Sequence, residues 1–177
     1  WETVEWLGNQ YKQIGETEKS FDAFTRLHEH DPTNFAYLDN LFDLSQQLGK
    51  STSAQIKLLG KMQAIQPENL RVLEFLADKT GSLKWINAGL KLDGASGRLN
   101  FLKGDFYFKK WQQDTAKQDS VRALTWYRKA TGDPQWRGNA KRMIDELDPP
   151  LSEEEKRKRE FFDNSKKKEE VGNTGKK

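Results

Sequence analysis

A 34-residue spacing of apolar and small residues is the feature that most limits how this chain can fold. In residues 1–34 the spacing is carried by eight positions, namely Val4, Leu7, Gly8, Tyr11, Gly15, Ser20, Phe24 and Leu27. Because positions three and four apart lie on one face of a helix, they predict two amphipathic helices separated at Gly15. Asp31 and Pro32 end the second helix, since the residue before a proline avoids the α region.

The same spacing recurs downstream in three further units, which cover about residues 35–68, 69–94 and 97–134. The second unit repeats the pattern with Leu38, Leu41, Phe42, Ser45, Gly49, Ala54 and Leu58. The third unit is degenerate, and the fourth restores the pattern with Leu102, Gly104, Tyr107, Ala123, Tyr127, Ala130 and Pro134. One helical hairpin cannot bury its apolar face alone, so four in tandem predict a stacked array.

Two features at the end of the array complete the fold prediction. The fourth unit is long, and we expect its extra residues in the turn around Gln112 to Gln118. A further helix over residues 135–148 carries Trp136, Ala140, Met143 and Ile144, as a terminal capping helix must in order to cover the last apolar face. The sequence therefore predicts an all-α solenoid of helix-turn-helix repeats over residues 1–148, with a C-terminal capping helix and a charged tail.

The repeat resembles the tetratricopeptide repeat, over about residues 1–134. That family's 34-residue unit places large, Leu, Gly, Tyr, small and aromatic residues at these spacings and ends in Pro. Val4 and Ser20 depart from it, because the family prefers Trp and Ala there. The resemblance implies that the first helix of each unit lines a concave groove, and that extended or helical peptides bind in it.

The groove-facing positions of such a unit are the second, fifth, sixth, ninth and twelfth. In the first three units they give these candidate partner-binding residues: Glu2, Glu5, Trp6, Asn9, Lys12, Asp39, Asn40, Asp43, Arg71, Glu74 and Asp78. Six are acidic and two are basic, so we expect the groove to attract a basic or amide-rich protein or peptide. Trp6 is either the anchor of a partner or a core residue that seals the face towards an upstream repeat.

One branch of the family clamps the terminal carboxylate of a partner with two asparagines and several basic residues. Asn9 and Asn40 fall where those asparagines would be, but Glu5 occupies a position that should be basic. A carboxylate would be repelled there, so we do not expect a clamp of this kind.

A charged tail over residues 149–177 follows the array. Ser152 and Glu155 form a capping-box pattern that predicts a short helix over about residues 152–163. The remaining Lys- and Glu-rich residues are expected to be disordered. Phe161 and Phe162 are candidates for docking the tail to the body or to a partner, and a solvated charged tail is the competing interpretation.

The composition argues against several other classes of protein. A formal net charge of +3 lacks the strong basic footprint of a nucleic-acid binder, so no nucleic-acid partner is expected. The chain has no cysteine, and His28 and His30 point in different directions on a helix, so no metal or cofactor is expected. We find no catalytic signature and expect no enzymatic activity.

Location remains open in the sequence. No apolar run approaches the roughly 20 residues of a membrane span, and no targeting segment is visible. The absence of cysteine fits the cytoplasm and the bacterial periplasm equally. Because the chain begins at Trp1 inside the repeat pattern, we expect it to be a fragment or a processed product. The oligomeric state is also open.

The leading functional hypothesis is a protein–protein interaction scaffold or assembly factor that binds a partner in the groove. The alternative is a structural subunit permanently packed in a larger multiprotein complex, which would expose aromatic residues such as Trp1, Trp6, Trp111 and Trp126. An RNA-binding helical repeat ranks last, because base-reading repeats need a basic groove.

Overall fold

The computed structural model describes residues 1–149, 155 and 157. Within them it contains nine helices and no strand, so the all-α prediction is confirmed. The helices are α1 (Glu2–Gln13), α2 (Thr17–His30), α3 (Phe35–Gln47), α4 (Thr52–Ile65), α5 (Leu70–Thr80), α6 (Leu83–Leu92), α7 (Gly97–Asp114), α8 (Lys117–Ala130) and α9 (Arg137–Leu147).

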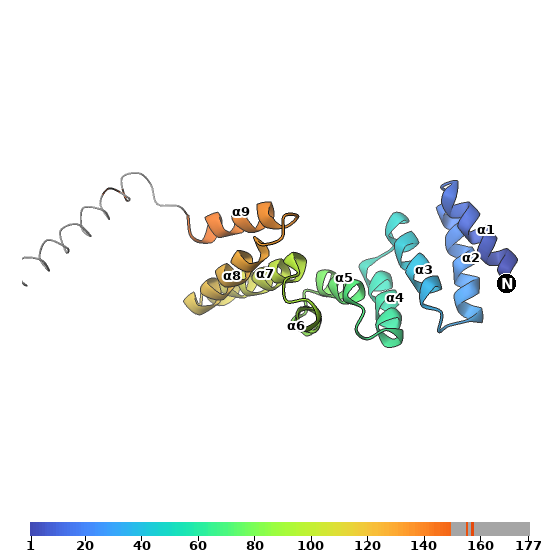
Figure 1. Cartoon of the computed structure of the whole chain (residues 1–177), viewed down its shortest axis with the longest axis horizontal. Coiled ribbons are helices and arrows are strands. Elements are labelled where there is room, and N and C mark those ends of the chain that lie inside the picture. Colours follow the sequence, from blue (N-terminus) through green and yellow to red (C-terminus); the bar gives the residue numbers. More distant parts are fainter. Residues whose placement is uncertain (150–154, 156, 158–177) are drawn as a thin grey trace, which may run out of the picture.

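Helices α1 to α8 form four helix-turn-helix pairs that follow one another in a row (Figure 1). Each helix packs on the next one along the chain, and α5 also packs on α7. The pair α1 and α2 lies at one end of the row, and α9 lies over α8 towards the other end (Figure 1). The molecule is therefore an elongated solenoid in which each pair is held by its neighbours.

Glycine makes the turn within each of the first three pairs. Gly15, Gly49 and Gly81 have φ values of 79°, 61° and 61°, a left-handed conformation that costs glycine little. In the fourth pair Thr115 takes this conformation, with a φ of 54°.

The prediction of a long turn in the fourth unit is wrong. Helix α7 continues to Asp114, and only Thr115 and Ala116 connect it to α8. The extra residues lengthen the helix, and its last turns are paired: Lys110 contacts Asp114 at 3.8 Å and buried Asp119 at 2.7 Å. The hydrogen bond from Lys110 holds the pKa of Asp119 below its ordinary value of 3.8.

Side-chain caps explain where five of the helices begin. Asn34, Ser51, Asn69, Ser82 and Ser96 precede α3 to α7 in order, and each accepts a hydrogen bond from a backbone N–H in the first turn. These bonds satisfy donors that a helix leaves without an internal partner.

The core runs along the solenoid as successive apolar clusters rather than as one centre. Phe24 and Leu44 belong to the cluster at the first junction, and Phe42 and Leu76 to the next one. At the far end, α9 buries Ala140 against α8, and the Trp136 ring lies 5.1 Å from that of Phe101. Helix α9 therefore covers the last pair.

Most of the charged tail falls outside the described residues. Glu155 and Arg157 are helical, whereas the rest of the predicted helix over residues 152–163 and the predicted disordered segment are not described. Phe161 and Phe162 also lie outside the described residues. In the described part of the chain, no helix has the length and apolar character needed to cross a membrane.

Candidate partner-binding face

The eleven predicted groove residues lie on α1, α3 and α5, the first helices of successive pairs. Side-chain bonds join α1 to α3. Lys12 Nζ donates to Asn40 Oδ1 at 2.7 Å, and the Tyr37 hydroxyl donates to Glu5 Oε2 at 3.1 Å. We call the surface made by these eleven residues and Arg98 the first-helix face.

A single arginine links α5 to α3. The Arg71 guanidinium contacts the carboxylates of Asp39 and Asp43, the latter at 2.8 Å. All three side chains are about one third to one half exposed. Exposed ion pairs add little stability, so the bridge chiefly fixes the positions of these groups on the surface.

A second arginine links α7 to α5. Arg98 lies 3.3 Å from Asp78, and the Ser96 hydroxyl donates to Glu74 at 2.7 Å. The half-buried ring of Phe75 lies 5.4 Å from the Arg71 guanidinium and 4.8 Å from that of Arg98. The two arginines thus pack on one aromatic ring, because the π face of the ring attracts cations.

These bridges change the charge that the sequence predicted for the face. Arg98 adds a third base, so six acids face three bases. Asp39, Asp43 and Asp78 each have an arginine partner, whereas Glu5 accepts from Tyr37 and Glu74 from Ser96. Because the single Arg71 balances only one of Asp39 and Asp43, part of the excess negative charge lies on that pair. The rest lies on glutamates, two of which, Glu2 and Glu5, are on α1.

The exposed aromatic residue of the face is Trp6, whose surface is 60% exposed. Trp1 is 56% exposed and stacks on His30, with ring centroids 4.2 Å apart. The expectation that Trp111 and Trp126 are exposed is wrong, because both are half-buried. Trp111 packs near Phe108, and two lysine side chains lie over Trp126.

Two pockets flank the bridge between Arg98 and Asp78. One, of about 410 Å³, is lined by Glu74, Ser96, Arg98 and Trp136 among others. The other, of about 600 Å³, is lined by Asp78, Asp105, Phe106 and Lys109 among others. Burial raises the pKa of Asp105 above its ordinary value of 3.8. The surface is therefore hollowed beside both residues of the bridge.

The geometry disfavours a carboxylate clamp. The Asn40 amide oxygen accepts from Lys12, and its nitrogen donates to the carbonyl of Ala36 at 2.9 Å. The amide oxygen and one of the two amide N–H groups are therefore engaged within the fold. Among the described residues there is no group of three or more His, Cys, Asp or Glu side chains that could hold a metal ion.

The fold is that of a tetratricopeptide-like α-solenoid. No family model matches the sequence, and no curated protein matches it. Solved structures do match the fold. A structure described as the MamA RS-1 ArsTM double mutant matches with a TM-score of 0.65 and 15% identity, over 98% of this chain and 96% of that chain.

Two further MamA structures show the same similarity. One described as MamA protein has a TM-score of 0.57 and 13% identity, over 82% of this chain and 88% of its own. The other, MamA MSR-1 C2, has a TM-score of 0.54 and 18% identity, over 73% and 78% respectively. At these identities the similarity establishes the fold alone.

Proposed function

We propose that this chain is a non-enzymatic protein-binding scaffold whose first-helix face holds a segment of a partner protein. The observation that carries the proposal is the continuity of the face. Side-chain bridges connect α1, α3, α5 and α7, so polar groups from four repeats are presented in fixed positions on one surface. Pre-positioned groups lose less conformational entropy when they bind a partner.

The partner would contact an aromatic anchor and a polar track. Trp6 supplies the exposed aromatic surface at the α1 end. Trp and Arg are the residues that most often dominate binding energy at interfaces, and the face contains both. Because its excess charge is negative, the bound segment would be basic or amide-rich.

Affinity capture with matched baits tests this proposal. The baits are the wild-type chain, a Trp6→Ala variant, and a Val121→Ala control on α8, whose side chain is also exposed, at 54%. A partner that uses the face is retained by the wild type and the control and depleted with Trp6→Ala. The purified partner should bind the Trp6→Ala variant at least about tenfold more weakly.

A further bait lacking residues 149–177 separates the face from the tail. A partner that binds this bait as well as the whole chain uses the array. If every specific partner is lost with the tail, or if Trp6→Ala retains the same proteins as the wild type, the first-helix face is not the binding surface.

The structural-subunit alternative is favoured by one observation, the exposure of large apolar side chains around α1. Trp1, Trp6 and Ile14 are all more than half exposed. A subunit that packs permanently through them would aggregate when purified alone, and capture would recover a whole complex. Light scattering of the purified chain distinguishes it from a scaffold that stays dispersed without its partner.

A further inference from the structure

The second helices of the middle repeats carry charge of one sign. Helix α4 contains Lys57 and Lys61, helix α6 contains Lys84 and Lys91, and neither helix contains an acidic residue. All four lysines are exposed. The first-helix face has the opposite excess, so the two kinds of helix present surfaces of different charge.

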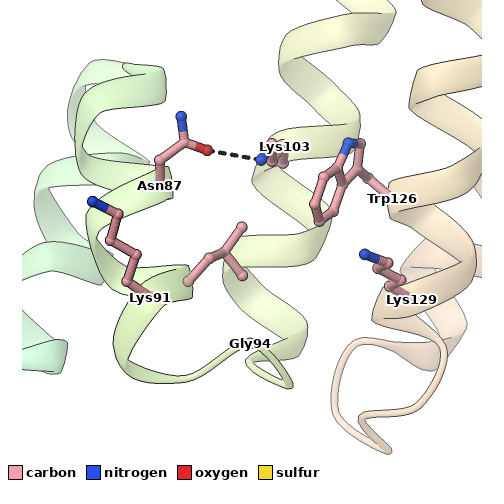
Figure 2. A pocket seen from close by; sticks show the side chains of 7 residues that line it. Asn87, Lys91, Gly94, Lys103, Trp126 and Lys129 are labelled. Carbon is pink, nitrogen blue, oxygen red and sulfur yellow. Dashed lines mark hydrogen bonds between the residues drawn. The ribbon is translucent and has the colours of Figure 1, made fainter.

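The basic side contains a pocket of about 570 Å³ between α6, α7 and α8. Figure 2 shows Asn87 and Lys91 from α6 on one side, Trp126 and Lys129 from α8 on the other, and Lys103 from α7 between them. Leu90 and Gly94 complete the lining. Three of these seven residues are cationic and none is acidic.

The cations in this Trp126 pocket are crowded around one indole. The ammonium nitrogens of Lys103 and Lys129 lie 3.9 Å and 4.1 Å from the centroid of the Trp126 ring. The two distances add to 8.0 Å, which is the greatest separation the two charges can have. Burial and the charge of Lys129 lower the pKa of Lys103 below its ordinary value of 10.5.

The positions of these groups are set by the fold. Lys103 Nζ donates to Asn87 Oδ1 at 2.7 Å, so the ammonium is held between α6 and the indole (Figure 2). Within the described residues, Lys91, Lys103 and Lys129 form no ion pair. The fold therefore holds positive charges close together, and no acidic side chain in the described part of the chain pairs with them. An anion bound in the pocket would supply the missing negative charge and reduce their repulsion.

The walls of the pocket restrict the kind of anion. Leu90 and the Trp126 ring offer apolar surface beside the lysines, which suits an acidic side chain next to an apolar one. Nucleic acid needs a basic groove that follows its backbone and several stacking aromatics, whereas this pocket has one aromatic and the whole chain a net charge of only +3. We propose that the Trp126 pocket binds glutamate or aspartate side chains from an acidic, partly apolar segment of a partner protein.

Fluorescence anisotropy with defined probes tests the proposal. The probe is a short fluorescein-labelled peptide in which glutamates alternate with leucines, and the reference peptide has glutamine at each glutamate position. The wild-type chain should bind the glutamate peptide and not the glutamine peptide. Raising the salt from about 50 mM to about 500 mM should weaken binding several-fold, because exposed charges are then screened.

Variants with the same change in net charge locate the binding. Lys103→Gln combined with Lys129→Gln should weaken binding at least about tenfold. The control, Lys117→Gln combined with Lys141→Gln, removes two exposed lysines outside the pocket and should bind like the wild type. The Trp6→Ala variant should also bind the glutamate peptide like the wild type. This test is therefore independent of the proposal that the first-helix face binds a partner.

Three results would overturn the proposal. Equal weakening in the pocket variant and its control would mean that the peptide senses only net charge. Binding of a single-stranded oligonucleotide through Lys103 and Lys129 more tightly than the glutamate peptide would make the pocket a nucleic-acid site. Binding of inorganic phosphate by wild type without binding of the peptide would make it a phosphate site.

Discussion

Gly104 of α7 lies directly against the ring of Tyr127 on α8. A methyl group at Gly104 would be 2.5 Å from ring carbons Cδ1 and Cε1, and Tyr127 is fully buried. Gly8 occupies the same place in the first pair, where a methyl group would be 3.2 Å from a ring carbon of Phe24. The glycine of the repeat therefore lets the two helices of a pair approach over a large aromatic ring.

Gly104→Ala should destabilise the fold by about 1–3 kcal/mol, because the ring has no room for the methyl group. This steric cost exceeds the gain from the higher helix propensity of alanine, which alone would raise the stability by up to about 1 kcal/mol. Gly60→Ala is the matched control, since α4 has open space there and the change should be stabilising. Urea unfolding measures both, and equal stability of the two variants would contradict the packing argument.

The hydroxyl of Tyr127 donates to Asp105 Oδ1 at 2.7 Å, and burial raises the pKa of both groups. Tyr127→Phe should cost about 1–3 kcal/mol at neutral pH, because it leaves a partly buried carboxylate without its donor. In an Asp105→Asn background the same change should cost less. A double-mutant cycle measures the coupling, and a coupling of zero would mean that the bond adds nothing.

Asp105→Asn also has a predicted pH dependence. Between 3.8 and its raised value, the folded state holds a proton that the unfolded chain has lost, so stability falls as pH rises through this window. Asparagine removes that penalty and keeps an acceptor for Tyr127. We expect the variant to be more stable than the wild type at about pH 7 and not at about pH 3. A gain at both pH values would contradict the assignment.

The sequence predicts the fold well because its signals are local. The spacing of Leu38, Leu41 and Phe42 places them on one buried stripe, and Gly15 marks the turn of the first pair. In the third unit Gly81 was expected within the first helix, whereas it forms the turn after α5. The prediction from the sequence is wrong in the fourth pair, because the same number of extra residues fits either a longer turn or a longer helix. Contact between Lys110 and Asp119 accompanies the longer helix.

The surfaces are only partly predictable, for a tertiary reason. The repeat register predicts that the residues of the first-helix face lie on one side. It does not predict that Arg71 pairs with Asp39 and Asp43, because this contact joins two different repeats. The Trp126 pocket was not predicted, because Lys103 and Trp126 come from different helices. The absence of acidic residues from α4 and α6 is a signal in the sequence that could have indicated a basic surface.

Arg71→Gln tests whether the charge of the first-helix face selects its partner. The change frees Asp39 and Asp43 and should cost less than about 1 kcal/mol of stability, because the pairs are exposed. A short peptide of alternating lysines and leucines should associate faster with the variant than with the wild type. Arg142→Gln on α9 makes the same charge change elsewhere and is the control. Equal association rates for the two variants would mean that net charge alone governs the encounter.

We expect His28 to make the stability of the chain sensitive to mildly acidic pH. It is buried, with 8% of its surface exposed, and its Nε2 lies 2.8 Å from Lys61 Nζ. Lysine only donates, so Nε2 accepts and Nδ1 carries the proton, without a partner among the described residues. Burial and the charge of Lys61 lower the pKa of His28 below its ordinary value of 6.5.

The lowered pKa fixes the direction of the effect. As pH falls through 6.5, His28 takes up a proton in the unfolded chain but stays neutral in the folded chain. The contribution of neutral His28 to the free energy of unfolding is therefore fully present above pH 6.5 and is lost as pH falls below it. His28→Gln should therefore flatten the fall in melting temperature between about pH 7.5 and about pH 5.5. His30→Gln removes an exposed histidine and should leave that fall unchanged. If both variants follow the wild-type curve, protonation of His28 does not cause the fall in melting temperature. A buried imidazole with a lowered pKa contributes to that fall, so its replacement must make the curve less steep.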